Sequence, residues 1–331
     1  MFKPAVMTLV LVILVFESPA AGQSQECVAR GQYFGLDMPG SSPEIFAPGI
    51  ASTQHHDDWI PVFSPSGREV VLRVNGKISG EIIGVLFWSS MDETGCWSEP
   101  TPLPFSGQYG DGAAVFSPDG SRIYFSSRRP DPGEVQASES SQVWQVDRVG
   151  QNWAEPVLLD SPVNQYHVNG GLSMAADGTL VVAMIAPMGK GGLDIYELAP
   201  DGDSYPTFEP VVGPINSEAG EVAPYIDLQK RFLIYTSYSP ETGLSTLISQ
   251  READGSWGPP QPVPVINDFE SKFVGLSPDG EILFFVSHRQ VEESNPDASW
   301  SLDLFDDLAI QDNADCYWVS SQVVKDGLLE P

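Results

Sequence analysis

Four histidines and three arginines are the side chains of this sequence whose types best suit binding or catalysis. The histidines are His55, His56, His167 and His288, and the arginines are Arg128, Arg129 and Arg289. Imidazole nitrogens bind transition metals, and guanidinium groups clamp carboxylate or sulfate groups. No helical HExxH spacing organises the histidines. Arginines in so acidic a chain more often pair with Asp and Glu, so a ligand site and ordinary ion pairing both remain open.

A second candidate set is rich in oxygen ligands. It comprises Asp58, Asp111, Asn169, Glu221 and Ser271. Each stands at the same distance before one copy of a recurring phrase. Carboxylate, amide and hydroxyl oxygens suit a hard cation such as Ca²⁺ better than Zn²⁺. The alternative is that these residues are solvated and cap the starts of strands.

The recurring phrase combines a tight turn with an apolar run. It reads FSPSGREVVLR at 63–73, FSPDGSRIYFSS at 116–127 and LSPDGEILFFVS at 276–287. Alignment of all copies places five turn positions in register, namely Gly67, Gly120, Gly178, Lys230 and Gly280. The unit therefore recurs roughly every fifty residues. Two further segments follow in phase, as in LDIYELA (193–199) and WGPPQPV (257–263).

Each unit thus contains four short β-type runs separated by Gly, Pro, Asp and Asn. Four strands in a repeat of this length are typical of an all-β β-propeller, in which each copy is one blade. We expect five blades, with six as the alternative. Residues 43–50 (PEIFAPGI) precede the first unit and should supply the outer strand of the last blade, which closes the ring.

These motifs resemble the TolB-like, WD-like β-propeller repeats of exported bacterial proteins. The resemblance covers nearly all of 33–331 and includes SPDG before an aromatic strand, GGLDIYEL, DGSWGPP followed by PVIN, and the terminal YWVSS. It implies a periplasmic or secreted protein that binds proteins or other ligands, with catalysis in only some relatives. The sequence departs from the pattern at Lys230 and in a long insertion within 287–315.

Strand order assigns the candidate residues to one side of the propeller. We letter the four strands of each unit a to d in chain order. Successive antiparallel strands alternate in direction, so connections from b to c and from d to the next a share one face. All four histidines, the three arginines and the oxygen-rich set fall on connections of this class. We therefore expect the binding face there, with the 287–315 insertion beside the channel mouth.

Residues 1–22 have the layout of a cleaved secretory signal: Lys3, a 13-residue apolar stretch and a small-residue end. A retained membrane anchor is the alternative, and 23–331 is expected to form one domain. The three cysteines, Cys27, Cys96 and Cys316, allow one disulfide. Face assignment favours Cys27 with Cys96, and free thiols are the other possibility.

The net charge and the absence of certain motifs narrow the classes of function that this protein can have. A formal charge of −29 excludes nucleic-acid binding as a reasonable function, because such a surface repels phosphate. SMDETGCW (90–97) approaches the Asp-box of sialidases, but its Gly is one position late; a GxSxG elbow and a phosphate loop are absent from the sequence. We expect an exported, monomeric binding scaffold for an envelope or extracellular protein, a glycan or a small ligand. The alternative is a polysaccharide hydrolase or lyase with its site on the same face.

Overall fold

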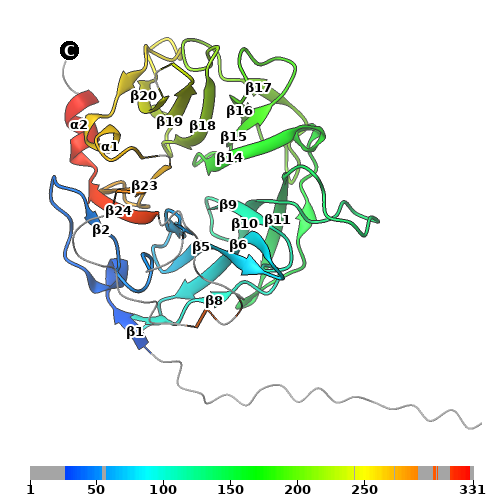
Figure 1. Ribbon diagram of the computed structural model, residues 1–331, viewed down its shortest axis with the longest axis vertical. Helices are drawn as coiled ribbons and strands as arrows, with labels where there is room; N and C mark the ends of the chain where they lie inside the picture. Colours follow the sequence, from blue (N-terminus) through cyan, green and yellow to red (C-terminus); the bar gives the residue numbers. More distant parts are fainter. Residues whose placement is uncertain are drawn as a thin grey trace, which may run out of the picture.

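The computed structural model describes residues 27–53, 57–241, 243–271, 273–289, 301–302, 304 and 314–328. They form five antiparallel blade sheets arranged around a central axis, together with a two-stranded sheet near the N-terminus (Figure 1). The prediction of an all-β propeller with five blades is confirmed, and the six-bladed alternative is wrong. In the described part of the chain, no helix is long and apolar enough to span a membrane.

Each blade has four strand positions, denoted a to d from the axis outward. In blade 1 two short strands share position a, and in blade 2 the short strand β12 (Asn152–Trp153) also pairs with the strand at position c. Blade 1 contains β3 (Asp57–Asp58) with β4 (Val62–Phe63), β5 (Glu69–Ile78), β6 (Glu81–Ser90) and β8 (Thr101–Pro102). Blade 2 contains β9 (Asp111–Phe116), β10 (Arg122–Ser127), β11 (Gln142–Val149) and β13 (Val157–Leu158). Blade 3 contains β14 (His167–Met174), β15 (Leu180–Ile185), β16 (Asp194–Leu198) and β17 (Phe208–Pro210). Blade 4 contains β18 (Gly220–Ile226), β19 (Phe232–Ser239), β20 (Gly243–Gln250) and β21 (Gln261–Pro262).

Blade 5 is built from both ends of the chain. Its strands are β22 (Val274–Leu276), β23 (Ile282–Ser287), β24 (Asp315–Ser320) and β2 (Glu44–Ile45). Strand β2 pairs with β24 through Glu44 opposite Trp318 and Ile45 opposite Tyr317. Figure 1 shows this N-terminal strand beside the C-terminal one. A strand from the predicted segment 43–50, Glu44–Ile45, therefore closes the ring.

The same turn joins strands a and b in every blade. Its last residue donates its amide to the carbonyl three positions earlier, and these donors are Gly67, Gly120, Gly178, Lys230 and Gly280. The glycines have positive φ, and Lys230 adopts φ 58° in the same left-handed region. The Lys230 ammonium lies 2.6 Å from an oxygen of Asp177 in the preceding blade. A contact between blades thus accompanies the loss of glycine from the fourth turn.

A polar side chain after each strand d bonds the backbone of strand c in the same blade. These residues, which we name the blade locks, are Ser106, Asn164, Asn216, Asn267 and Ser52 for blades 1 to 5. Asn216 accepts from the Ile195 amide at 2.8 Å and donates to the carbonyls of Ile195 at 2.9 Å and Val211 at 3.2 Å. In blade 5, Ser52 both accepts from and donates to the backbone of Cys316. Each lock fixes the path of the chain from one blade to the next.

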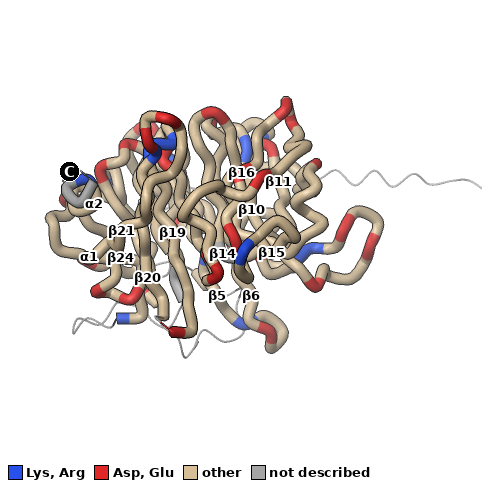
Figure 2. The backbone as a smooth tube through the Cα atoms, turned by 90° about the horizontal axis from the view of Figure 1, so that it is seen from above, with Lys and Arg blue, Asp and Glu red and all other residues tan. Residues whose placement is uncertain are grey.

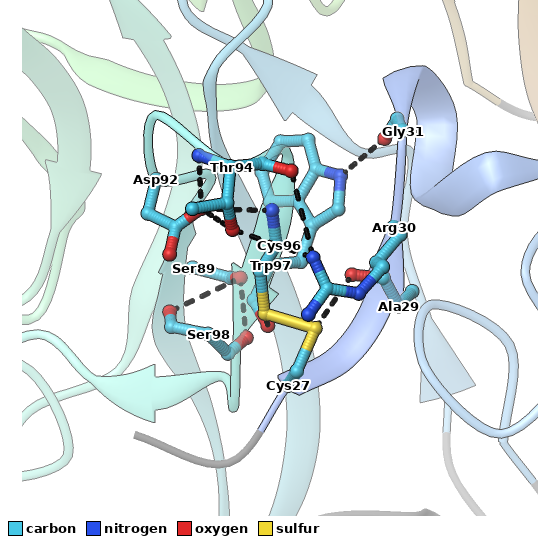
Figure 3. The surroundings of a disulfide bond; sticks show 10 residues. All are labelled: Cys27, Ala29, Arg30, Gly31, Ser89, Asp92, Thr94, Cys96, Trp97 and Ser98. Atoms are coloured by element: carbon cyan, nitrogen blue, oxygen red, sulfur yellow. Dashed lines mark hydrogen bonds between the residues drawn. A yellow bond between two sulfur atoms is a disulfide. The ribbon is translucent and has the colours of Figure 1, made fainter. Parts of the chain in front are cut away.

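The N-terminal segment is fastened across the junction of blades 5 and 1. Strand β1 (Cys27–Arg30) pairs with β7 (Cys96–Ser98), and a disulfide joins Cys27 to Cys96 (Figure 3). The favoured disulfide is confirmed, and Cys316 is a buried free thiol. The indole of Trp97 donates to the Gly31 carbonyl at 2.7 Å. Beyond β1, the hydroxyl of Tyr33 donates to Asp279 of blade 5 at 2.9 Å.

Aromatic and aliphatic side chains fill the spaces between neighbouring blades. At the closure, Phe46 is fully buried with its ring centroid 4.9 Å from Phe284 and 5.0 Å from Trp318. The tryptophans that open the strand d segments, Trp97, Trp153 and Trp257, are all buried. They pack in the core clusters between blades rather than project from the surface.

Candidate functional site

Asp111 of the oxygen-rich set is the first residue of β9 and is almost fully buried. Its carboxylate accepts from Ser106 Oγ at 2.5 Å and Ser127 Oγ at 2.6 Å, and lies 3.0 Å from the Arg129 guanidinium. Burial raises the pKa of Asp111, against the opposing effect of Arg129 and the two hydroxyls. Arg129 therefore forms an ion pair with an acid, which is the alternative to ligand binding that the sequence left open. The Asp111 carboxylate is hydrogen-bonded to Ser127 of its own blade and to Ser106, the lock of blade 1.

The other members of the set lie in different surroundings. Glu221 is buried in β18 and accepts from Ser217 through both its amide and its hydroxyl. Burial raises its pKa, with a further rise from Asp194. Asn169 is exposed on β14, and Ser271 is buried with its hydroxyl 3.4 Å from the Phe273 carbonyl. The backbone of Asp58 pairs with Val74, and its side chain lies outside the described part.

The two histidines that the structure describes belong to different blades. His167 begins β14 opposite Ile185, and His288 follows β23. His55 and His56 lie outside the described residues. No three His, Cys, Asp or Glu side chains within the described ranges form a group that could hold a metal ion. Calcium binding at the oxygen-rich set stays a prediction.

The two remaining predicted arginines lie exposed beside their own blades. Arg128 donates from Nε to the Ser138 carbonyl at 3.2 Å. Arg289 lies over the Phe269 ring at 4.6 Å, and its guanidinium is 3.4 Å from the Asp268 carbonyl. Most of the insertion expected at the channel mouth lies outside the described residues. These contacts leave ligand binding by Arg128 and Arg289 a prediction.

Exposed apolar side chains mark the face that carries the candidate histidines and arginines, although nothing in the sequence distinguishes them. We denote as the b–c face the side that carries the connections from strand b to c and from d to the next a. An exposed large apolar residue stands in or beside the b–c connection of every blade: Ile82, Val135, Met188, Tyr238 and Leu304 for blades 1 to 5. Val135 is 90% exposed and Ile82 58%. Only the folded ring shows that these scattered residues share one side.

Acidic residues accompany these apolar side chains. Exposed carboxylates in the same connections include Glu81, Asp131, Glu134, Glu139 and Glu241. Figure 2, a side view, shows Asp and Glu outnumbering Lys and Arg along the loops, including the long loop between β10 and β11. Apolar contacts interspersed with negative charge suit a complementary surface that is both apolar and basic.

Comparisons with known proteins identify no family. No family model matches the sequence, and no curated protein matches it. Similar solved structures include a TolB from Agrobacterium tumefaciens, at 15% identity and TM-score 0.47 over 80% of this chain and 90% of that one. A glycoside hydrolase matches at 11% identity and TM-score 0.47, over 87% and 93% of the two chains. An α-L-arabinofuranosidase from Lactobacillus brevis matches at 13% and 0.44, over 83% and 92%. Similarity at this level says nothing of what this chain binds or catalyses.

Proposed function

We propose that this protein is an exported binding scaffold that docks a basic protein on its b–c face. The observation that carries the proposal is the exposed apolar residue beside the b–c connection of each blade. Single exposed apolar residues are ordinary, but residues gathered on one face of a rigid scaffold are typical of an interaction surface. A propeller presents them from five separate loops, so one partner can contact several blades at once.

Charge defines the class of partner. The chain carries 45 Asp and Glu against 16 Lys and Arg. A partner with Lys and Arg around an apolar patch gains a faster encounter, and the apolar contacts then slow its dissociation. Export through residues 1–22 would place the partner in the envelope or outside the cell. The hydrolase or lyase alternative stays a prediction, since no described contact favours it.

A photo-crosslinking amino acid at Met188 or at Tyr238 tests the docking face. Both are about half exposed on the b–c face, whereas Val157 is 59% exposed on outer strand β13 and serves as the matched position. We expect one basic protein to crosslink from Met188 and Tyr238 in the native envelope, and not from Val157. Equal yields from all three positions would contradict docking on this face.

The purified partner then provides the quantitative measurement. Met188→Asp and Tyr238→Asp should each weaken its affinity at least about tenfold, because each buries a charge at an apolar contact. Val157→Asp should leave the affinity unchanged. The association rate should fall as salt is raised, since salt screens the attraction between opposite charges.

A further inference from the structure

A ring of small and apolar side chains surrounds the axis on the side opposite the b–c face. It consists of the second residue of each a–b turn: Pro65, Pro118, Ala176, Leu228 and Pro278. All five line a central cavity of about 250 Å³. The identical turn in each blade sets these residues at equivalent positions, so the repeat itself builds one mouth of the cavity.

Residues of the five inner strands continue the lining toward the middle of the ring. Most of the lining residues are apolar. They include an aromatic pair, Trp59 and Phe273, whose ring centroids lie 4.1 Å apart. Because most of the lining is apolar, a ligand with an apolar body that displaces water from this space gains from the burial of apolar surface. The volume is close to the lower end of the range of small-molecule sites, about 300–1,000 Å³.

Charged groups contribute little to this lining. Among the described lining residues, none is Asp or Glu, and Arg73 is the one that carries a charge. Its Nε donates to the Asp111 carbonyl at 2.9 Å, and its guanidinium lies 3.8 Å from the centre of the Trp59 ring. A side chain at Gly84 would clash with this guanidinium, so glycine leaves room for it. Arg73 is thus held against the wall of the cavity by the protein itself.

Tyr225 supplies a polar group of another kind. It lines the cavity from β18, and its hydroxyl makes no hydrogen bond with the described part of the chain. Burial raises the pKa of Tyr225, so the hydroxyl stays protonated at neutral pH and can donate. The Tyr225 side chain is only partly buried and lines the cavity, so a ligand that occupies the cavity can replace water as the hydrogen-bond acceptor for this hydroxyl.

We propose that the central cavity binds an uncharged, aromatic small molecule that carries one hydrogen-bond acceptor for Tyr225. The apolar body fills the space between the inner strands, and the acceptor, such as a ketone oxygen, meets the hydroxyl. The cavity lining includes none of the five exposed apolar residues of the proposed docking face, so the two sites use different side chains. Either proposal can fail without the other.

Titration with N-phenyl-1-naphthylamine, a neutral probe that fluoresces in apolar surroundings, tests occupancy of the cavity. We expect saturable binding of one probe per chain. Val115→Trp fills the cavity from β9 and should weaken binding at least tenfold, whereas Val149→Trp, at a position 62% exposed on β11, should have no effect. Ala113→Leu replaces the first variant if thermal unfolding shows that it does not fold. Absence of saturable binding, or equal binding by the filled and control variants, overturns the proposal.

Displacement of that probe tests the ligand class. The compounds 2-acetylnaphthalene and 2-ethylnaphthalene share one aromatic body, and only the first has an acceptor. The ratio of their affinities should shift about fivefold against the ketone in Tyr225→Phe, the loss expected for one neutral hydrogen bond. The anion 2-naphthoate should displace the probe more weakly than the ketone. An unchanged ratio in Tyr225→Phe, or stronger displacement by 2-naphthoate, overturns the assignment of an uncharged acceptor-bearing ligand.

Discussion

The blade locks show how one side chain can fix a whole strand connection. Asn216 is 3% exposed and uses its amide both to accept and to donate. Asn164 makes the equivalent bonds to Val143 and Leu159 in blade 2. An asparagine suits this position because its amide supplies donors and an acceptor to backbone groups that a turn leaves unpaired.

Asn216→Ala should lower the free energy of unfolding by about 2–4 kcal/mol, since it leaves buried backbone groups of Ile195 and Val211 without partners. Urea denaturation followed by tryptophan fluorescence measures the change. Asn152→Ala is the control, because Asn152 is exposed in β12 (Asn152–Trp153), and should change stability by less than about 0.5 kcal/mol. Similar effects of the two substitutions would show that Asn216 is no lock.

At the scale of elements, the closure depends on a segment outside the repeats. Strand β1 adds to the c–d hairpin of blade 1, and Tyr33 reaches the a–b turn of blade 5. The disulfide fixes one end of this segment, and the pairing of β2 with β24 fixes the other. Blades 1 and 5, which lie far apart in the sequence, are thereby held together.

Replacing Cys27 and Cys96 by Ser should lower the free energy of unfolding by about 2–5 kcal/mol, because the crosslink restricts the unfolded chain. Urea denaturation with and without dithiothreitol measures this effect. Reductant should destabilise the natural protein to a similar degree and leave the double variant unchanged. A natural protein insensitive to reductant would contradict a stabilising role for the bond.

The whole molecule is a ring whose first and last blades must meet. Without residues 23–50, blade 5 loses its outer strand and Phe46, which packs on Phe284 and Trp318. An unpaired β24 edge and an open junction then replace a continuous core. Cooperative unfolding of the propeller should therefore depend on this N-terminal segment.

Deletion of 23–50 should remove the single sharp transition seen by near-ultraviolet circular dichroism during heating. A synthetic peptide of residues 23–50, added in excess, should restore part of it. Phe46→Ala is the milder variant and should cost about 3–5 kcal/mol, because it empties a fully buried aromatic site. If the truncated chain melts as sharply and at the same temperature as the natural protein, the ring does not need this closure.

The sequence alone determined the repeat, and with it the propeller and a closing N-terminal strand. It favoured five blades but left six open, and it preferred a disulfide between Cys27 and Cys96 but left free thiols open. These follow from local chemistry: a turn such as SPDG, and an apolar run able to fill both faces of a blade, are legible in a single copy. Lys230 could be assigned to the turn position of the fourth repeat because the residues around it align with the other repeats. Its residue type gave no sign of the positive φ that it adopts.

The tertiary structure decided what each exposed or buried side chain meets. Asp111 and Arg129 are candidate ligand-binding residues by type, yet the fold buries them against each other. Successive members of the five apolar residues of the b–c face lie 50 to 66 residues apart in sequence, and those of the five residues lining the cavity mouth 50 to 58 apart, so each is unremarkable there. They form surfaces only because closing the ring brings equivalent positions of different blades around one axis, and contact at long range is what a linear pattern does not encode.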